Sequence, residues 1–227
     1  MSKGRAACAC AWLAVCIVYV VQALDGLYKI ELARNPFWFW MHDVALWVIV
    51  APLAMWGVLR LTHISSRELG FISSIRGTRS WPHAFALASA AMISLPIAYW
   101  IANVTPVERL FAFIPTVEAI DGQVMPMPPL KWGVVGYMAI TAGIIEEFFY
   151  RALPYALLVA PRPTALRKWM YVLATSLVFG LVHWEQNAHF VGVAFVFGMV
   201  AATWYLRVAN VYPLMVGHTA TSALWLS

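Results

Sequence analysis

The sequence predicts an all-α, polytopic transmembrane helix bundle of about seven helices. Hydrophobic residues fill 63% of the 227 positions and charged residues only 11%, too few to solvate the surface of a water-soluble globule. Seven apolar runs approach the roughly 20 residues that a helix needs to cross a hydrocarbon core. Twelve Trp and nine Tyr suit membrane interfaces, where one end of the ring is dry. We therefore expect one membrane domain over residues 1–227, surrounded by lipid bilayer.

Each apolar run is expected to be helical, because backbone polar groups must bond internally where water is absent. The runs span approximately residues 6–24, 37–61, 82–102, 132–160, 169–183, 190–206 and 208–226. The fifth and sixth are short for a crossing. The longest connection, residues 103–131, contains five prolines and a short apolar piece at 111–117. We expect an ordered outer loop there, with an interfacial helix or a lid as the alternative.

The cations in the connections predict the orientation, because Lys and Arg are retained on the cytoplasmic side during insertion. A cytoplasmic N-terminus places ten cations inside: Lys3, Arg5, Arg60, Arg67, Arg76, Arg79, Arg162, Arg167, Lys168 and Arg207. Four lie outside: Lys29, Arg34, Arg109 and Lys131. We expect seven crossings, a C-terminus outside, and residence in a bacterial cytoplasmic (inner) membrane.

The first apolar run also has the basic start and apolar stretch of a signal peptide, but it is long and its cleavage-site pattern is weak. We expect it to be retained. We also expect its removal to leave the candidate site untouched, because all candidate residues lie beyond position 140. Its three cysteines, Cys8, Cys10 and Cys16, have no His or acidic neighbour and are interpreted as small lipid-buried side chains.

The net charge of +5 does not indicate a nucleic-acid partner, because the cations are dispersed among apolar runs and form no stripe with interleaved aromatic residues. Membrane topology explains their distribution better.

The fourth run carries three ionisable residues in the segment GIIEEFFYRALPYALL, namely Glu146, Glu147 and Arg151. Charge at membrane depth is costly, so each group requires a partner or a function. Glu147 and Arg151 are four residues apart with the acid first, the favourable order for an intrahelical ion pair. Glu146 points about 100° away on a regular helix. We therefore expect Glu146 to face an interior cavity and to exchange a proton there.

Two later runs carry histidines at membrane depth. The fifth run ends FGLVHW, which places Phe179 and His183 on one face and provides Gly180 for close helix approach. The last run reads VGHTATSALW, which places His218, Thr221 and Ser222 along one stripe beside Gly217. A single buried His is most often a packing residue, but two histidines and a free carboxylate on three helices together favour a site.

These groups predict a hydrolytic site that needs no cofactor. A carboxylate and a His can polarise water for attack on a peptide carbonyl, and another His with a nearby donor can stabilise the oxyanion. Glu185 and His189 could form a metal-like cluster together with His183, but no HExxH spacing is present. We expect no metal and interpret these two residues as an interfacial cap. His42 and Asp43 are interpreted as interfacial as well.

The motifs resemble those of the CPBP family, the CAAX proteases and bacteriocin-processing (Abi-type) enzymes, which are glutamic intramembrane proteases. That family carries EExxxR, FxxxH and HxxxN on successive helices. Here they stand as Glu146-Glu147-Phe-Phe-Tyr-Arg151, Phe179-Gly-Leu-Val-His183 and His218-Thr-Ala-Thr-Ser222. The stretch Arg67-Glu68-Leu69-Gly70-Phe71 is similar to one that these proteins often carry on the cytoplasmic side. The resemblance extends from about residue 65 to the end.

The resemblance implies an intramembrane endopeptidase that cleaves a membrane-tethered peptide, with the active site on helices within residues 132–226. The implied substrate is prenylated and CAAX-like, or carries a leader or a C-terminal sorting signal. Glu146 and His183 would activate water, His218 and position 222 would hold the oxyanion, and Glu147, Arg151 and Phe179 would support them. Ser222 stands where the family has Asn, so Thr221 or Thr219 could supply that donor instead.

Two other functions remain open at the level of sequence. The same polar core could serve only helix packing in a non-catalytic immunity protein or membrane partner. Buried carboxylates and histidines also mark ion pathways, which would suit a transporter or a proton relay. No internal repeat is detectable, which weighs against a transporter.

Overall fold

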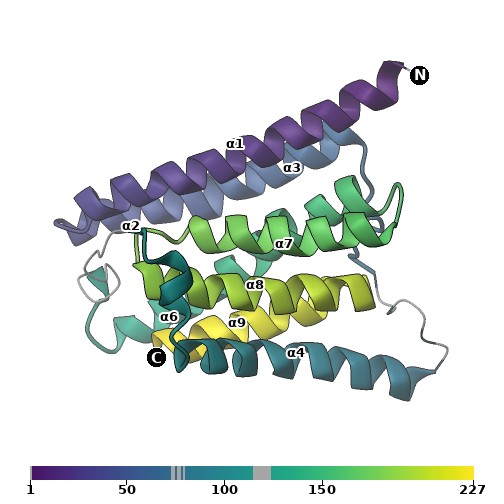
Figure 1. Ribbon diagram of the computed structural model, residues 1–227. Coiled ribbons are helices and arrows are strands. Elements are labelled where there is room, and N and C mark those ends of the chain that lie inside the picture. The colour runs from purple at the N-terminus through teal and green to yellow at the C-terminus, as the bar shows by residue number, and fades with distance from the viewer. Residues whose placement is uncertain (1, 73–74, 76–77, 79, 115–123) are drawn as a thin grey trace.

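The computed structural model describes residues 2–72, 75, 78, 80–114 and 124–227. In these residues the chain forms seven helical runs joined by turns and short loops (Figure 1). The all-α fold is therefore confirmed. The runs are α1 (Ser2–Leu32); α2 (Pro36–Val44) continuing through η1 (Ala45–Val50) into α3 (Ala51–Thr62); α4 (Trp81–Asn103); α6 (Leu130–Thr141) continuing through η3 (Ala142–Glu146), η4 (Phe148–Ala152) and η5 (Tyr155–Val159); α7 (Ala165–Leu181); α8 (Ala188–Val208); and α9 (Tyr212–Leu226).

Five of the described runs are long and apolar enough to cross a membrane: Trp12–Leu32, Pro36–Thr62, Trp81–Asn103, Leu130–Val159 and Ala188–Val208. α7 and α9, with 17 and 15 residues, are shorter. The sixth run is longer than expected because the Asn187 side chain caps α8, accepting a hydrogen bond from the Phe190 N–H at 2.9 Å. The last helix is shorter than expected because α8 ends at Ala209, in the left-handed region with φ 44°, and α9 begins just before Pro213.

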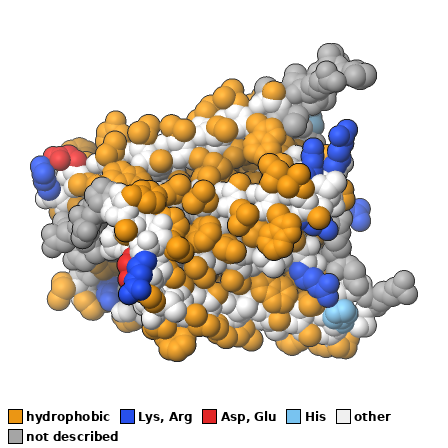
Figure 2. All heavy atoms as spheres, in the orientation of Figure 1, with side chains coloured by type: hydrophobic (Ala, Val, Ile, Leu, Met, Phe, Trp, Pro, Cys, Tyr) orange, Lys and Arg blue, Asp and Glu red, His pale blue; other side chains and the backbone are white. Residues whose placement is uncertain are grey.

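The described surface is largely apolar along the flanks of the bundle (Figure 2). On α1 the exposed large side chains are Leu13, Ile17, Val20, Val21, Leu24, Leu27 and Tyr28. A water-soluble protein of this size rarely exposes so large a continuous apolar surface. Lipid contact explains it, in agreement with an integral membrane protein.

Lys and Arg side chains gather at the end of the bundle where the chain starts, on the right of Figure 2. They lie in the last turns of α3 and α8, the loop after α3, the loop before α7 and its first turn: Arg60, Arg67, Arg162, Arg167, Lys168 and Arg207. Arg76 and Arg79 belong to the predicted cytoplasmic set but lie outside the described residues. A cytoplasmic location for this end stays a prediction.

Close contacts at glycines hold the helices of the candidate site together. A Cβ atom on Gly180 of α7 would lie 2.8 Å from the Val191 carbonyl oxygen of α8, and one on Gly217 of α9 would lie 2.9 Å from the Met92 carbonyl oxygen of α4. Both glycines were expected to permit close approach. A third, Gly143 of η3, lies against α9, where its Cβ would be 2.8 Å from the Met215 carbonyl oxygen.

The stretch at residues 67–71 closes the Lys- and Arg-rich end of the bundle. Leu69 is fully buried, and its carbonyl accepts a hydrogen bond from the Tyr205 hydroxyl at 2.8 Å. Gly70 has φ +72°, a conformation that favours glycine, and its carbonyl accepts from the Val211 N–H at 3.1 Å. The loop therefore anchors the turn between α8 and α9.

Gly143 provides a test of the contact between η3 and α9. We expect Gly143→Ala to lower the free energy of unfolding by about 1–3 kcal/mol, because the added methyl group forces the two backbones apart. Gly136→Ala, whose Cβ would meet nothing within 4 Å, is the matched control and should not destabilise. Thermal unfolding in detergent measures both. Equal stability of the two variants would refute the close contact.

Candidate active site

The fourth helical run departs from regular α-helical geometry where the chemistry is concentrated. Wide π-type turns occur at 142–146, 148–152 and 155–159, and Glu147 lies between the first two. Such turns are rare and often occur at functional sites. They re-aim neighbouring side chains, so the directions of Glu146 and Glu147 could not be obtained from regular helical spacing alone.

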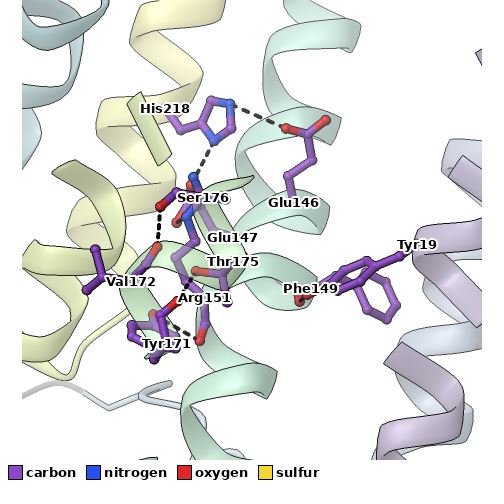
Figure 3. Close-up of polar contacts among 10 residues, drawn as sticks. All are labelled: Tyr19, Glu146, Glu147, Phe149, Arg151, Tyr171, Val172, Thr175, Ser176 and His218. Carbon is purple, nitrogen blue, oxygen red and sulfur yellow. Dashed lines mark hydrogen bonds and ion pairs between the residues drawn. The ribbon is translucent and has the colours of Figure 1, made fainter. Parts of the chain in front are cut away.

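Four charged or polar side chains form a continuous chain across two helical runs (Figure 3). Arg151 Nε lies 3.7 Å from Glu147 Oε2, which confirms the expected ion pair. Glu147 Oε1 lies 2.8 Å from His218 Nδ1, and His218 Nε2 lies 3.6 Å from Glu146 Oε2. None of the four residues is more than 6% exposed. The imidazole of His218 therefore lies between two buried carboxylates.

The contacts of His218 assign its ring nitrogens. An ionised carboxylate only accepts hydrogen bonds, so Nδ1 carries a hydrogen and donates to Glu147. A proton on Nε2 as well would make the ring a cation, and two cations would then balance the carboxylates of Glu146 and Glu147. The separation of 3.6 Å from Glu146 exceeds hydrogen-bond length, so Nε2 and the Glu146 carboxylate both keep bonding capacity toward a further group.

His183 also has one bonded and one free ring nitrogen. Its Nδ1 donates to the Phe179 carbonyl oxygen at 2.7 Å, which leaves Nε2 as the free nitrogen of the ring. The Phe179 ring lies between the two histidines, with centroids 4.9 Å from His183 and 6.0 Å from His218. The Arg151 guanidinium carbon is 4.2 Å from the same ring centroid, a distance typical of a cation–π contact. Phe179 thus packs against both the supporting cation and the two imidazoles.

One cavity of about 140 Å³ joins the candidate residues. Its walls include Glu146, His183, His218 and Ser222, and a space of this size holds several water molecules. Thr221 also lines it, but its hydroxyl donates to the Gly217 carbonyl oxygen at 2.7 Å. Thr219 Oγ1 instead lies against Gly143.

The first helix contributes to the cavity, which corrects the expectation that its removal would leave the site untouched. Gln22 and Lys29 of α1 line the cavity. The Tyr19 hydroxyl donates to the Phe149 carbonyl oxygen at 2.9 Å, and the Tyr150 hydroxyl bonds Gln22. Loss of α1 would therefore open one wall. Gln22 is a polar residue in an apolar run, and this was the available signal.

The structure adds contacts for the residues interpreted as interfacial and does not test their membrane depth. Asp43 is buried, 5% exposed, lines the cavity and accepts a hydrogen bond from the Tyr137 hydroxyl at 2.8 Å. His189 is directed to Glu108 Oε2 at 3.2 Å and to Asn103 Oδ1 at 3.1 Å. Within the described residues no group of three His, Cys, Asp or Glu side chains is arranged to hold a metal ion.

The short apolar piece expected at 111–117 is described only in part. A single 3₁₀ turn, η2 (Val107–Phe111), precedes it and buries Phe111. Residues 115–123 lie outside the described residues. The choice between an ordered loop and an interfacial helix or lid is therefore not tested.

Comparison with known protein families gives one match. Residues 128–224 match the family model described as type II CAAX prenyl endopeptidase Rce1-like. This part of the chain is therefore similar to the Rce1-like family. The matched segment contains Glu146, His183, His218 and Ser222, so the resemblance to CAAX proteases is confirmed at the level of the family. No curated protein and no solved structure matches the chain.

The matched segment begins before α6 and ends in α9. α1, α2, α3 and α4 lie outside it, although α1 and α2 contribute Gln22, Lys29 and Asp43 to the cavity.

The buried pair of Arg151 and Glu147 provides a stability test. Arg151→Met should cost about 3–5 kcal/mol, because Glu147 is left as an uncompensated buried charge. The double variant Glu147→Gln with Arg151→Met should recover part of that loss. Chemical unfolding in detergent measures the cycle.

The exposed pair of Arg34 and Glu31, whose N–O distance is 2.8 Å, is the control. Arg34→Met should cost less than about 1 kcal/mol. The buried coupling would be contradicted if Arg151→Met destabilised the protein no more than Arg34→Met does. It would also be contradicted if the losses of Glu147→Gln and Arg151→Met simply added in the double variant.

Proposed function

We propose that this protein is an intramembrane endopeptidase in which Glu146 activates a water molecule to cleave a membrane-associated peptide. One observation supports it above the others: Glu146, His183, His218 and Ser222 line a single cavity inside the bundle, although they come from two helical runs and the turn after α7. Side chains used only for packing would have no need to surround space for water. The match to the Rce1-like family supports the same activity.

The proposed reaction assigns each group by its free bonding capacity. Glu146 takes a proton from the water, with the free Nε2 of His183 as a second acceptor, and the oxygen attacks the peptide carbonyl carbon. His218, as an imidazolium with Nε2–H, and the Ser222 hydroxyl donate to the oxyanion. Glu146 then returns its proton to the amide nitrogen as the C–N bond breaks. Glu147 and Arg151 keep His218 oriented throughout.

A second, apolar cavity supports a substrate with an apolar group next to the cleaved bond. It measures about 120 Å³ and shares Gln22, Trp47 and Glu146 with the first cavity. Its other walls come from α1, η1, α3, η3 and η4: Ile17, Val18, Val21, Leu46, Val50, Ala51, Ala54, Ile145, Phe149 and Tyr150. An isoprenoid chain or aliphatic side chains would suit this space.

The position of the cavity mouth favours a substrate from the outer side of the membrane. The cavity extends to Lys29 in the last turn of α1, Gln186 in the loop after α7, and Trp225 at the end of α9. These segments lie at the end opposite the Lys- and Arg-rich one. With a cytoplasmic N-terminus, an exported peptide with a leader or a C-terminal sorting signal would reach this mouth directly. A bacterial inner membrane fits that arrangement.

The role of Glu146 can be tested in proteoliposomes. The probes are internally quenched peptides: one with a farnesylated cysteine near its C-terminus, one apolar leader-like peptide and one C-terminal sorting-type peptide. We expect cleavage of at least one, and a fall of about 10²- to 10⁴-fold in kcat with Glu146→Gln, because the amide cannot accept the proton. Glu68→Gln, at an exposed carboxylate in the opposite loop, should leave cleavage unchanged.

Cleavage by the Glu146→Gln variant at the wild-type rate would refute the catalytic assignment. Failure of the folded wild-type protein to cleave any of the probes would favour a non-catalytic immunity or partner protein.

The role of Ser222 has a separate test. Ser222→Ala should reduce kcat by about 10²-fold, because one oxyanion donor is lost. Ser222→Asn restores the amide donor of the family motif and should retain cleavage. Steady-state kinetics with the cleaved probe separates kcat from KM. An unchanged kcat in Ser222→Ala would show that Ser222 is not the oxyanion donor and that another side chain has this role.

A further inference from the structure

A second cluster of ionisable residues lies at the outer end of the same cavity and takes no part in the proposed reaction. It comprises Asp25 and Lys29 of α1, His42 and Asp43 of α2, and Glu185 of the loop after α7. The three carboxylate residues are only 4–5% exposed. Lys29, Asp43 and Glu185 line the cavity directly. Charged groups buried this deeply require partners or a function.

Asp25 has the closest ion pairs of the cluster, although its Oδ2 accepts no hydrogen bond. Lys29 Nζ lies 3.2 Å from Asp25 Oδ2, and His42 Nε2 lies 2.6 Å from Asp25 Oδ1. Lys29, which is positively charged at neutral pH, is thus already close to the Asp25 carboxylate. Asp43 has the Tyr137 hydroxyl at 2.8 Å, which is a neutral donor. The charge of Lys29 also acts on Asp43 and Glu185, so one lysine faces three carboxylates.

Glu185 is the least satisfied member of the cluster. Its Oε2 is buried and has no hydrogen-bond partner, although the residue is only 5% exposed and lines the cavity. Burial raises the pKa of the Glu185 carboxyl, and Lys29 and His183 oppose that shift. Gly26 of α1 packs against it, since a Cβ there would lie 3.1 Å from Glu185 Cβ. The side chain is therefore held at the cavity with an open acceptor.

We propose that Asp43 and Glu185 form a recognition subsite for a positively charged group of the peptide substrate, namely a lysine or arginine side chain or a free amino terminus. Such a group would donate hydrogen bonds to the open Glu185 oxygen and balance the excess of carboxylates over Lys29. An organic cation fits better than a metal ion, because the described residues provide no three-ligand arrangement.

This inference rests on the proposed proteolysis and adds a determinant of specificity to it. The subsite and Glu146 line the same cavity, so one extended peptide can place its cleaved bond at Glu146 and a cationic residue at the mouth. Asp43 lies outside the segment that matches the Rce1-like family, whereas Glu185 lies inside it. The preference would thus depend on how the N-terminal helices are joined to the catalytic helices.

Binding measurements with an inactive protein separate this proposal from catalysis. The probe is a set of end-blocked heptapeptides of Ala and Leu with one arginine at each position in turn. Each has a counterpart with citrulline, which keeps the shape of arginine but lacks its charge. The protein is the full-length Glu146→Gln variant in detergent, and the readout is Kd from fluorescence anisotropy.

For at least one position we expect the arginine peptide to bind about tenfold tighter than its citrulline counterpart, a difference typical of one charge-assisted hydrogen bond. Adding Glu185→Gln or Asp43→Asn should reduce this ratio, and adding both should remove it. Glu31→Gln, at an exposed carboxylate of the same end of α1, should leave it unchanged.

Equal Kd values for the arginine and citrulline peptides at every position would overturn the proposal. That comparison needs no change in the subsite, so it holds even if the Asp43 and Glu185 variants do not fold. A ratio that survives the double substitution would also overturn it. The assay measures binding and not cleavage. Its result can therefore be interpreted even if the protein proves not to be a protease.

Discussion

The burial of Arg151 is the constraint on which the rest of the site depends. A guanidinium that is 1% exposed inside an apolar bundle is tolerable only beside a carboxylate and a polarisable surface. Glu147 provides the carboxylate from the same helical run, and Phe179 of α7 provides the ring. Glu147 in turn binds His218 of α9. One buried cation thereby joins three helices, and Glu146 is positioned as a consequence.

Two parts of the chain contribute residues to the candidate site. The segment that matches the Rce1-like family, residues 128–224, contains the carboxylates, the imidazoles and the supporting arginine. The N-terminal helices supply the remaining walls of both cavities through Gln22, Lys29 and Asp43 on one side and the apolar residues of α1, η1 and α3 on the other. The proposed chemistry thus lies within the matched segment, whereas the proposed recognition groups come from both parts of the chain.

Much of the fold and of the candidate site could be predicted, because membrane insertion makes both strongly patterned. Apolar length gave the helical runs, and the cost of buried charge singled out Glu146, Glu147, Arg151 and the two histidines. The acid–base spacing gave the Glu147–Arg151 pair. Gly180 and Gly217 were predicted from their positions beside histidines.

The features that were missed depend on packing between distant segments. The π-type turns around Glu146 begin where η3 lies against α9, and regular helical spacing does not reveal them. Asp43 lies near the start of its run, and the sequence did not reveal that it is buried, bonded by Tyr137 and part of the cavity wall. The role of Gln22 depends on its hydrogen bond with the Tyr150 hydroxyl, which lies 128 positions away in the sequence.

The central claim is that Glu146 and His218 act as one unit across the cavity. The most direct measurement is the cleavage rate of Glu146→Gln, His218→Asn and the double variant on one probe peptide, since residues that act together have non-additive effects. We expect the double variant to be about as slow as the slower single variant. Losses that multiply, or a His218→Asn variant as fast as the wild-type protein, would show that the two side chains do not share one reaction.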